Sequence, residues 1–176
     1  MSRRVAVLSP GGELVHHLLA ALAERGIELD ALVLYVPGVP RYWRRLESAR
    51  ARLLALPLLP ARWAGWRLRV RMDARLRRGA RRVIFTGPLN GVRMERHLRR
   101  LDPHVLVLAG CGLLDPHILG VPREGTVGVH PALLPWVRGN GAIENSILGG
   151  VPLGCTAFRV DPGIDTGPVL ERRLVR

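Results

Sequence analysis

The chain has 176 residues, of which 48% are hydrophobic and 23% are charged. This length and balance are typical of one soluble globular domain, and no run approaches the roughly 20 apolar residues that span a bilayer. The apolar run Val5–Leu8 is too short for a secretory signal, so we expect a cytoplasmic protein. Cys111 and Cys155 are too few for a disulfide framework or a zinc cage, and we expect buried free thiols.

The net charge of +13 comes from 27 basic residues, and every one of them is arginine. Arginines are concentrated between Arg41 and Arg100, where few acidic residues oppose them. We interpret residues 37–82, which also hold three tryptophans, as an insertion or an elaborated crossover on a single domain covering residues 1–176. The arginine-rich segment fits three roles, namely a solvated face with arginine stems packed on tryptophan, contact with nucleic acid, or contact with an anionic membrane.

Hydrophobic periodicity predicts strands and helices that alternate along the chain. Short apolar or alternating runs predict strands over residues 4–9, 29–36, 83–86, 105–109, 126–129, 153–160 and 169–175. Apolar residues at helical spacing predict helices over residues 13–25, 92–101 and 142–148. Gly26 suits the position just after the first helix, where a positive φ is common.

This alternation predicts an α/β fold with a mainly parallel, Rossmann-like sheet and flanking helices. Ligands of such folds bind outside the carboxyl ends of the strands. Three segments leave predicted strands with glycine, histidine or acidic residues: Gly110–Leu114, His130–Pro135 and Asp161–Gly167. We expect these segments to meet at one edge of the sheet.

Two residues in these segments are candidates for acid–base chemistry. His130 follows a strand and precedes a proline-stiffened loop, and histidine exchanges a proton near neutral pH. Asp165 lies among glycines and could orient an imidazole or accept its proton. A structural histidine and a plain surface turn are the alternatives for these two residues.

The second half of the chain carries five motifs in order, namely Gly110–Leu114, Val129–Pro135, Arg138-Gly139, Gly154–Thr156 and Asp161–Pro168. Together they resemble the signature of the formyltransferase family. That family includes enzymes that formylate glycinamide ribonucleotide, initiator methionyl-tRNA and amino-sugar nucleotides, and also formyl-tetrahydrofolate hydrolases. The resemblance is dense from about residue 101 to residue 170 and weak in the arginine-rich segment.

The resemblance implies that an amine attacks the formyl group of N10-formyl-tetrahydrofolate, without a metal. His130 would stabilise the tetrahedral oxyanion, and Asp165 would organise His130 and help remove the amine proton. The implied folate-binding residues are Gly110, Cys111, Gly112, Leu113, Leu114, Asp161 and Ile164. The implied residues for the acceptor are Gly11, Gly12, Arg138, Gly139 and Asn140.

The chain departs from the family pattern at three places. Gly128 stands where the family usually has an asparagine whose amide donates to the oxyanion, and losing one such donor costs about 10²–10³ in rate. A water or Asn140 could replace the donor, the enzyme could be slow, or the domain could bind folate without turnover. Glu13 follows the first glycine turn and would repel a phosphate, and the chain ends at Arg176, which suggests a minimal or truncated member.

These observations leave three functional hypotheses. The first is formyl transfer to an amine on a small molecule, possibly an amino sugar. The second is hydrolysis of formyl-tetrahydrofolate, and the third is a non-catalytic basic binding module on a degenerate formyltransferase scaffold. The sequence does not fix the acceptor or the oligomeric state.

Overall fold

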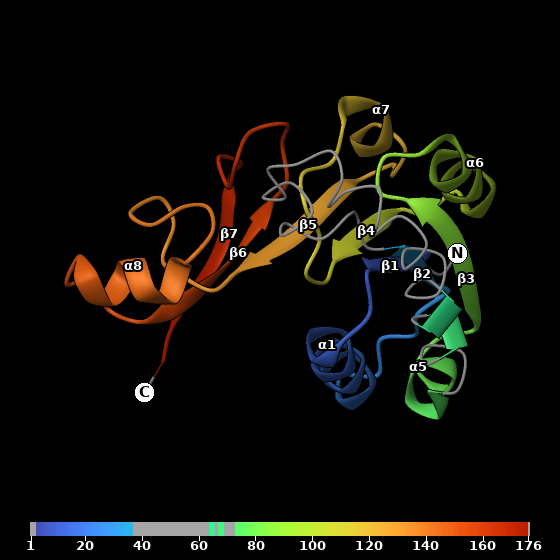
Figure 1. The fold of residues 1–176 in the computed structure, drawn as a ribbon, viewed down its shortest axis with the longest axis horizontal. Helices are drawn as coiled ribbons and strands as arrows, with labels where there is room; N and C mark the ends of the chain where they lie inside the picture. The colour runs from blue at the N-terminus through green and yellow to red at the C-terminus, as the bar shows by residue number, and fades with distance from the viewer. Residues whose placement is uncertain (1–2, 37–63, 66, 69–72, 176) are drawn as a thin grey trace, which may run out of the picture.

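The computed structural model describes residues 3–36, 64, 65, 67, 68 and 73–175, and these residues form one seven-stranded sheet (Figure 1). The strand order is β3-β2-β1-β4-β5-β6-β7. Strands β1 to β5 pair in parallel, and β6 and β7 pair antiparallel at one edge. The prediction of an α/β fold with a mainly parallel sheet is therefore confirmed. The strands are β1 (Val5–Ser9), β2 (Ala31–Val36), β3 (Arg82–Pro88), β4 (Val105–Leu108), β5 (Gly125–His130), β6 (Gly154–Arg159) and β7 (Val169–Leu174).

Helices cover both faces of the parallel part of the sheet, because its strands present apolar side chains alternately to each face. Helices α6 and α7 pack on one face, and α1 and α5 pack on the other (Figure 1). In β1, Ala6 and Leu8 face α6 and α7, whereas Val7 faces α1 and α5. The helices are α1 (Glu13–Glu24), α5 (Ala74–Arg78), α6 (Val92–Leu101), α7 (Pro116–Leu119) and α8 (Ala142–Leu148).

The predicted bounds agree with the observed elements to within a few residues, and α6 and α8 match at both ends. Gly26 has a φ of 65° just beyond α1, as its position predicted. Helix α7 was not predicted, because a single turn of four residues carries no periodic signal.

The arginine-rich segment lies mostly outside the described residues. Its described end forms α5, and Asp73 accepts hydrogen bonds from the backbone of Arg75 and Leu76 as the N-cap. Leu76 is buried against α1 and the sheet. Arg82, which the sequence analysis assigned to this segment, begins β3 instead.

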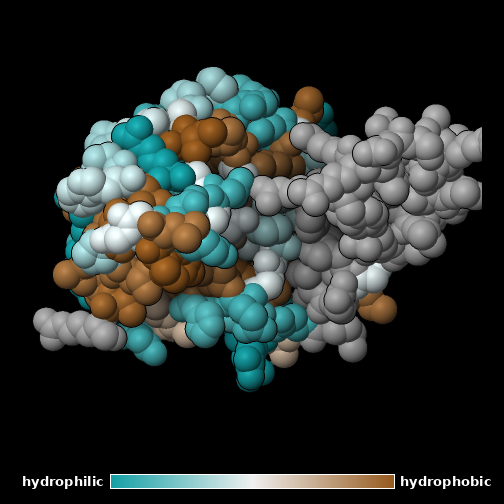
Figure 2. Space-filling model, turned by 60° about the vertical axis from the view of Figure 1, so that its left-hand side comes forward, coloured by the Kyte–Doolittle hydropathy of each residue, from teal (hydrophilic) through white to brown (hydrophobic). Residues whose placement is uncertain are grey.

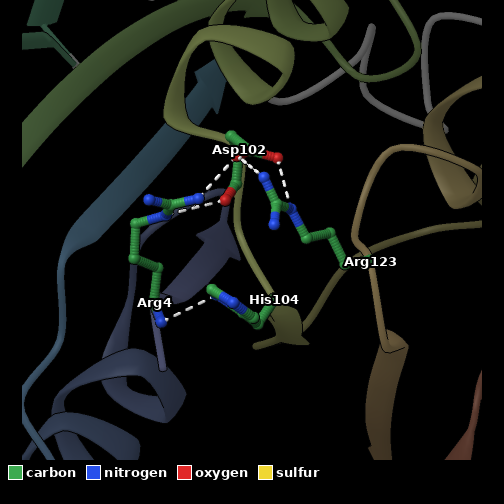
Figure 3. Close-up of polar contacts among 4 residues, drawn as sticks. All are labelled: Arg4, Asp102, His104 and Arg123. Atoms are coloured by element: carbon green, nitrogen blue, oxygen red, sulfur yellow. Dashed lines mark hydrogen bonds and ion pairs between the residues drawn. The ribbon is translucent and has the colours of Figure 1, made fainter. Parts of the chain in front are cut away.

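Four polar residues tie together the amino ends of β1, β4 and β5, at the opposite end of the strands from the predicted site (Figure 3). Asp102, in the left-handed region at φ 46°, accepts from Arg4 Nη2 at 2.5 Å and from Arg123 Nε at 2.9 Å. His104 Nδ1 accepts from the backbone of Arg4 at 3.1 Å. The hydrogen bond from Arg123 holds the pKa of Asp102 below its ordinary value, so this carboxylate stabilises the folded state when it is ionised.

The edge of the sheet formed by β7, together with helix α8, exposes several apolar side chains. Figure 2 brings the α8 and β7 side forward and shows hydrophobic residues gathered among hydrophilic ones. The exposed hydrophobic side chains of these two elements are Ile143, Ile147, Leu148, Leu170 and Leu174. In the described part of the chain, no helix combines the length and the apolar character needed to cross a membrane.

Candidate active site

A cavity of about 510 Å³ lies at the carboxyl ends of the central strands. Its lining includes residues from all three segments that the sequence analysis singled out. Gly110 to Leu114 form one wall, His130 and Pro131 lie at the end of β5, and Gly163, Ile164 and Asp165 come from the loop between β6 and β7. The first two segments follow parallel strands, which end at the same edge of a sheet. The third follows β6, which runs antiparallel to β5, and it reaches the cavity because its loop returns toward His130.

His130 is 5% exposed, and both nitrogens of its ring face a protein acceptor. Nε2 lies 3.1 Å from the backbone oxygen of Val137, and Nδ1 lies 3.3 Å from Oδ2 of Asp165. A carbonyl oxygen can only accept, so we infer that Nε2 carries a hydrogen. Nδ1 then faces the Asp165 carboxylate, at a distance that allows the two groups to share a proton. An oxyanion in the cavity would share this proton with Asp165, because neither N–H of the ring is free.

Asp165 is held in place by the loop that carries it and by the loop after β5. Its φ is 51°, a left-handed conformation that Asp tolerates better than most residues. The backbone N–H of Gly139 donates to Oδ2 at 2.9 Å. Asp161 does not line the cavity; its Oδ1 accepts from Gly163 N at 3.0 Å and from Thr166 Oγ1 at 2.6 Å. Asp161 thus shapes the loop that presents Asp165.

The loop after His130 is fixed by a buried hydroxyl on the neighbouring strand. Thr156 lies opposite His130 in the β5–β6 pair and is fully buried. Its Oγ1 donates to the Ala132 carbonyl at 2.7 Å and accepts from Leu134 N at 3.0 Å. The same loop supplies the Val137 carbonyl, so Thr156 helps to orient the imidazole.

Cys111 anchors the inner end of the glycine-rich wall. Its Sγ donates to the Leu8 carbonyl at 3.0 Å, and Tyr35 hydrogen-bonds to it. Desolvation raises the pKa of the thiol to about 12, so Cys111 is protonated at neutral pH and does not act as a nucleophile. Both cysteines are free, as predicted, but both are partly rather than fully buried because each lies close to a loop or an edge strand.

Gly128 lines the cavity two residues before His130, and the room beside it is taken by apolar side chains. A Cβ added at this position would lie 3.0 Å from Val160 Cγ2 and 3.1 Å from Phe158 Cε1. An asparagine would therefore need both neighbours to shift. Among the described residues that line the cavity, Asn140 is the one that carries a side-chain carboxamide.

Several predicted site residues lie beside the cavity rather than in its lining. Gly139 and Asn140 line it, whereas Arg138 is an exposed neighbour. Gly11 and Gly12 form the turn between β1 and α1, and the lining there is Leu14. Their roles in binding the acceptor stay predictions.

Sequence reasoning assigned no role to the residues that hold the site from outside. These are Thr156, Val137 and Asn90, which binds the glycine-rich wall. The pair Asn90-Gly91 is a turn signal and could have marked the turn between β3 and α6 that carries Asn90. Nothing in the sequence marks the Val137 carbonyl, because its role depends on the path of the loop.

The fold and the site define an α/β protein with a buried histidine–carboxylate pair in a cavity at the carboxyl ends of a parallel sheet. The profile of a family described as "Formyl transferase" matches residues 86–176, just over half of the chain. The chain belongs to the formyl transferase family.

Curated relatives match the same half of the chain. Methionyl-tRNA formyltransferase from Methylococcus capsulatus is 39% identical over 93 residues, which cover 52% of this chain and 30% of that protein. Methionyl-tRNA formyltransferase from Dehalococcoides mccartyi (strain CBDB1) is 39% identical over 83 residues, which cover 46% and 27%. The match thus spans less than a third of the length of these relatives.

Solved structures are similar in fold over nearly the whole chain. Glycinamide ribonucleotide transformylase 1 from Symbiobacterium toebii superposes with a TM-score of 0.65 at 20% identity and covers 98% of this chain and 73% of that one. A sugar N-formyltransferase from Shewanella sp. gives a TM-score of 0.58 at 17% identity, covering 100% and 58%. A formyltetrahydrofolate deformylase from Pseudomonas syringae pv. tomato gives 0.61 at 17% identity, covering 100% and 52%.

Proposed function

We propose that this chain transfers a formyl group from N10-formyl-tetrahydrofolate to an amine on a small molecule. The observation that carries the proposal is the His130–Asp165 contact of 3.3 Å at the wall of the 510 Å³ cavity. An imidazole and a carboxylate in contact can exchange a proton, which suits a reaction in which an amine loses a proton as it attacks. Membership of the formyl transferase family supports the same reaction.

The volume and lining of the cavity support a reduced folate as its ligand. Its volume lies within the range of small-molecule sites, which is roughly 300–1,000 Å³. Gly110 and Gly112 line it with backbone alone, and Leu113 and Ile164 offer apolar side chains that are each more than half exposed. When bound, the folate supplies an activated formyl group; the chain binds it and places it beside His130.

Three groups of the chain then share the work at the reacting carbon. Asp165 would take the proton of the attacking amine, directly or through a water, and share it with Nδ1 of His130. A proton from this pair would pass to N10 of the leaving tetrahydrofolate as its bond to the formyl carbon breaks. The amide of Asn140 donates to the developing oxyanion, in place of the asparagine that Gly128 lacks. The backbone N–H of Gly139 keeps Asp165 aimed at His130.

The acceptor class is the finer part of the proposal. The relatives named above act on methionyl-tRNA, glycinamide ribonucleotide or sugars, as their names state. Glu13 opens α1 beside the Gly11-Gly12 turn, and its charge disfavours a phosphate there. We therefore propose an amine on an unphosphorylated part of a small molecule, with an amino sugar as the first candidate.

The test is consumption of N10-formyl-tetrahydrofolate by the purified protein, with and without a panel of amino sugars and other amines. Tetrahydrofolate formation that depends on an added amine is the expected result. His130→Ala and Asp165→Asn should each abolish it; Asn tolerates the positive φ of position 165 and can still accept from Gly139. Formate release without any amine would instead show a hydrolase, and full activity in both variants would refute the proposed roles.

A further inference from the structure

The side chain of Asn90 hydrogen-bonds to the backbone at the cavity wall from a different part of the chain. Asn90 lies in the turn between β3 and α6, 23 residues before Leu113. Its Nδ2 donates to the Leu113 carbonyl at 3.0 Å, and its Oδ1 accepts from the backbone N–H of Asp115 at 3.0 Å. Both polar ends of one carboxamide are thus used on a single stretch of backbone.

This two-point contact imitates the pairing of parallel strands. In a parallel ladder, one residue donates to the carbonyl of residue i−1 of its neighbour and accepts from the N–H of residue i+1. The Asn90 amide makes the same two bonds on either side of Leu114. The extended conformation that results turns successive side chains to opposite sides.

The alternation decides what the cavity wall presents. Leu113 and Leu114 both line the cavity, but Leu114 is 4% exposed and packs into the core with α6 and α7, whereas Leu113 is 55% exposed. The stretch from Gly110 to Leu114 has no helix or strand of its own. Cys111 binds the inner end of this stretch to β1 through the Leu8 carbonyl, and the Asn90 amide binds its outer end.

The turn that carries Asn90 is itself well fixed. Asn90 has a φ of 63°, and the N–H of Gly91 donates to the Pro88 carbonyl at 3.1 Å across the turn. Asparagine is among the few residues other than glycine that adopt such a φ readily. Leu89 also lies next to Gly112, whose added Cβ would meet Leu89 Cδ2 at 3.4 Å.

We propose that Asn90 is a positioning residue for the folate, setting the conformation of residues 110–115 so that the cavity is preformed before the ligand enters. This inference rests on the proposed function, because it names the ligand that the wall receives. Asn90 does not line the cavity, so it acts through the backbone of Leu113 and Asp115. A preformed wall saves the cost of ordering a loop on binding, which appears as affinity.

The test is calorimetric titration of a non-reactive reduced-folate analogue into wild type, Asn90→Gly and Asn90→Asp. Glycine keeps the positive φ free of strain and removes the amide, so this variant isolates the two hydrogen bonds. Asp keeps the acceptor for Asp115 N and loses the donor to Leu113. We expect Asn90→Gly to bind about tenfold more weakly and Asn90→Asp to bind more weakly than wild type, with unfolding transitions like that of wild type.

Kinetics separate positioning from a general loss of structure. In Asn90→Gly the KM for the formyl donor should rise while kcat at saturating donor stays unchanged, because Asn90 does not touch the reacting atoms. Equal affinity in wild type and Asn90→Gly would overturn the proposal while leaving the proposed function standing. Absence of binding by wild type would overturn the proposed function, and with it the role of Asn90 in folate binding.

Discussion

Replacing Thr156 by valine tests how the loop beyond His130 is held. Valine has nearly the shape of threonine and suits a strand, so the change removes the hydroxyl without leaving a large void. The hydroxyl serves two backbone groups, the Ala132 carbonyl at 2.7 Å and the Leu134 N–H at 3.0 Å. Both residues are at most 1% exposed, so water cannot replace the lost partner.

The expected loss of stability follows from the two backbone groups that would be left without a hydrogen-bond partner. A buried donor or acceptor left without a partner costs about 1–3 kcal/mol. We therefore expect Thr156→Val to lower the free energy of unfolding by about 2–5 kcal/mol, a large part of the stability of a typical domain. Thr156→Ser is the matched control, since it keeps the hydroxyl and loses one methyl group, worth about 1 kcal/mol.

Urea unfolding followed by circular dichroism measures both variants against wild type. The expected order of stability is wild type, then Thr156→Ser, then Thr156→Val. If Thr156→Val proved as stable as Thr156→Ser, the hydroxyl would not hold the loop, and another contact would have to explain the orientation of His130.

The remaining predictions concern stability elsewhere in the chain. Gly167→Ala should lower the free energy of unfolding by roughly 3 kcal/mol or more, because its Cβ would lie 1.8 Å from a backbone carbonyl oxygen. At the control position, the Cβ of Gly87→Ala meets nothing within 4 Å and should change that free energy by less than about 1 kcal/mol, so similar urea midpoints for the two variants would contradict the reasoning. Asp102→Asn should be less stable than wild type at neutral pH, because the variant lacks the ionised carboxylate. Thermal unfolding should show this difference in stability vanish as the pH falls from above 3.8 through the lowered pKa of Asp102, and a difference that stays constant with pH would contradict the ion-pair account. Gly128→Asn should lower the free energy of unfolding by about 1–3 kcal/mol through its clash with Phe158, and an unchanged urea midpoint would show that the ring yields freely.

The alternation of apolar runs was enough to predict most of the fold. Ten elements follow from periodicity alone, because each long helix or buried strand repeats its pattern over several residues. Helix α5 lies at the end of the segment that the sequence analysis treated as an insertion. The antiparallel direction of β6 and β7 was not predicted, because it depends on how the chain returns through α8 and the Asp161–Gly167 loop.

The candidate site was only partly predictable. His130 and Asp165 could be named and paired because they stand where strands end, but the resemblance to a family was needed to choose this pairing over a structural histidine and a plain turn. Their contact and the bond from Gly139 to Asp165 depend on three-dimensional placement. The roles of Asn90 and Thr156 were not predicted, although Thr156 belongs to one of the family motifs. Their side chains bind backbone groups far away in sequence, and residue type does not reveal a backbone acceptor.

The measurement that tests the central claim most directly is calorimetric titration of a non-reactive reduced-folate analogue into wild type and Asp165→Gly. Glycine accepts the positive φ of position 165 and removes the carboxylate from the cavity wall, so the comparison requires no knowledge of the acceptor. We predict saturable binding of one analogue per chain in wild type and weaker binding in the variant. Absence of binding by correctly folded wild-type protein would contradict the assignment of this cavity to a folate.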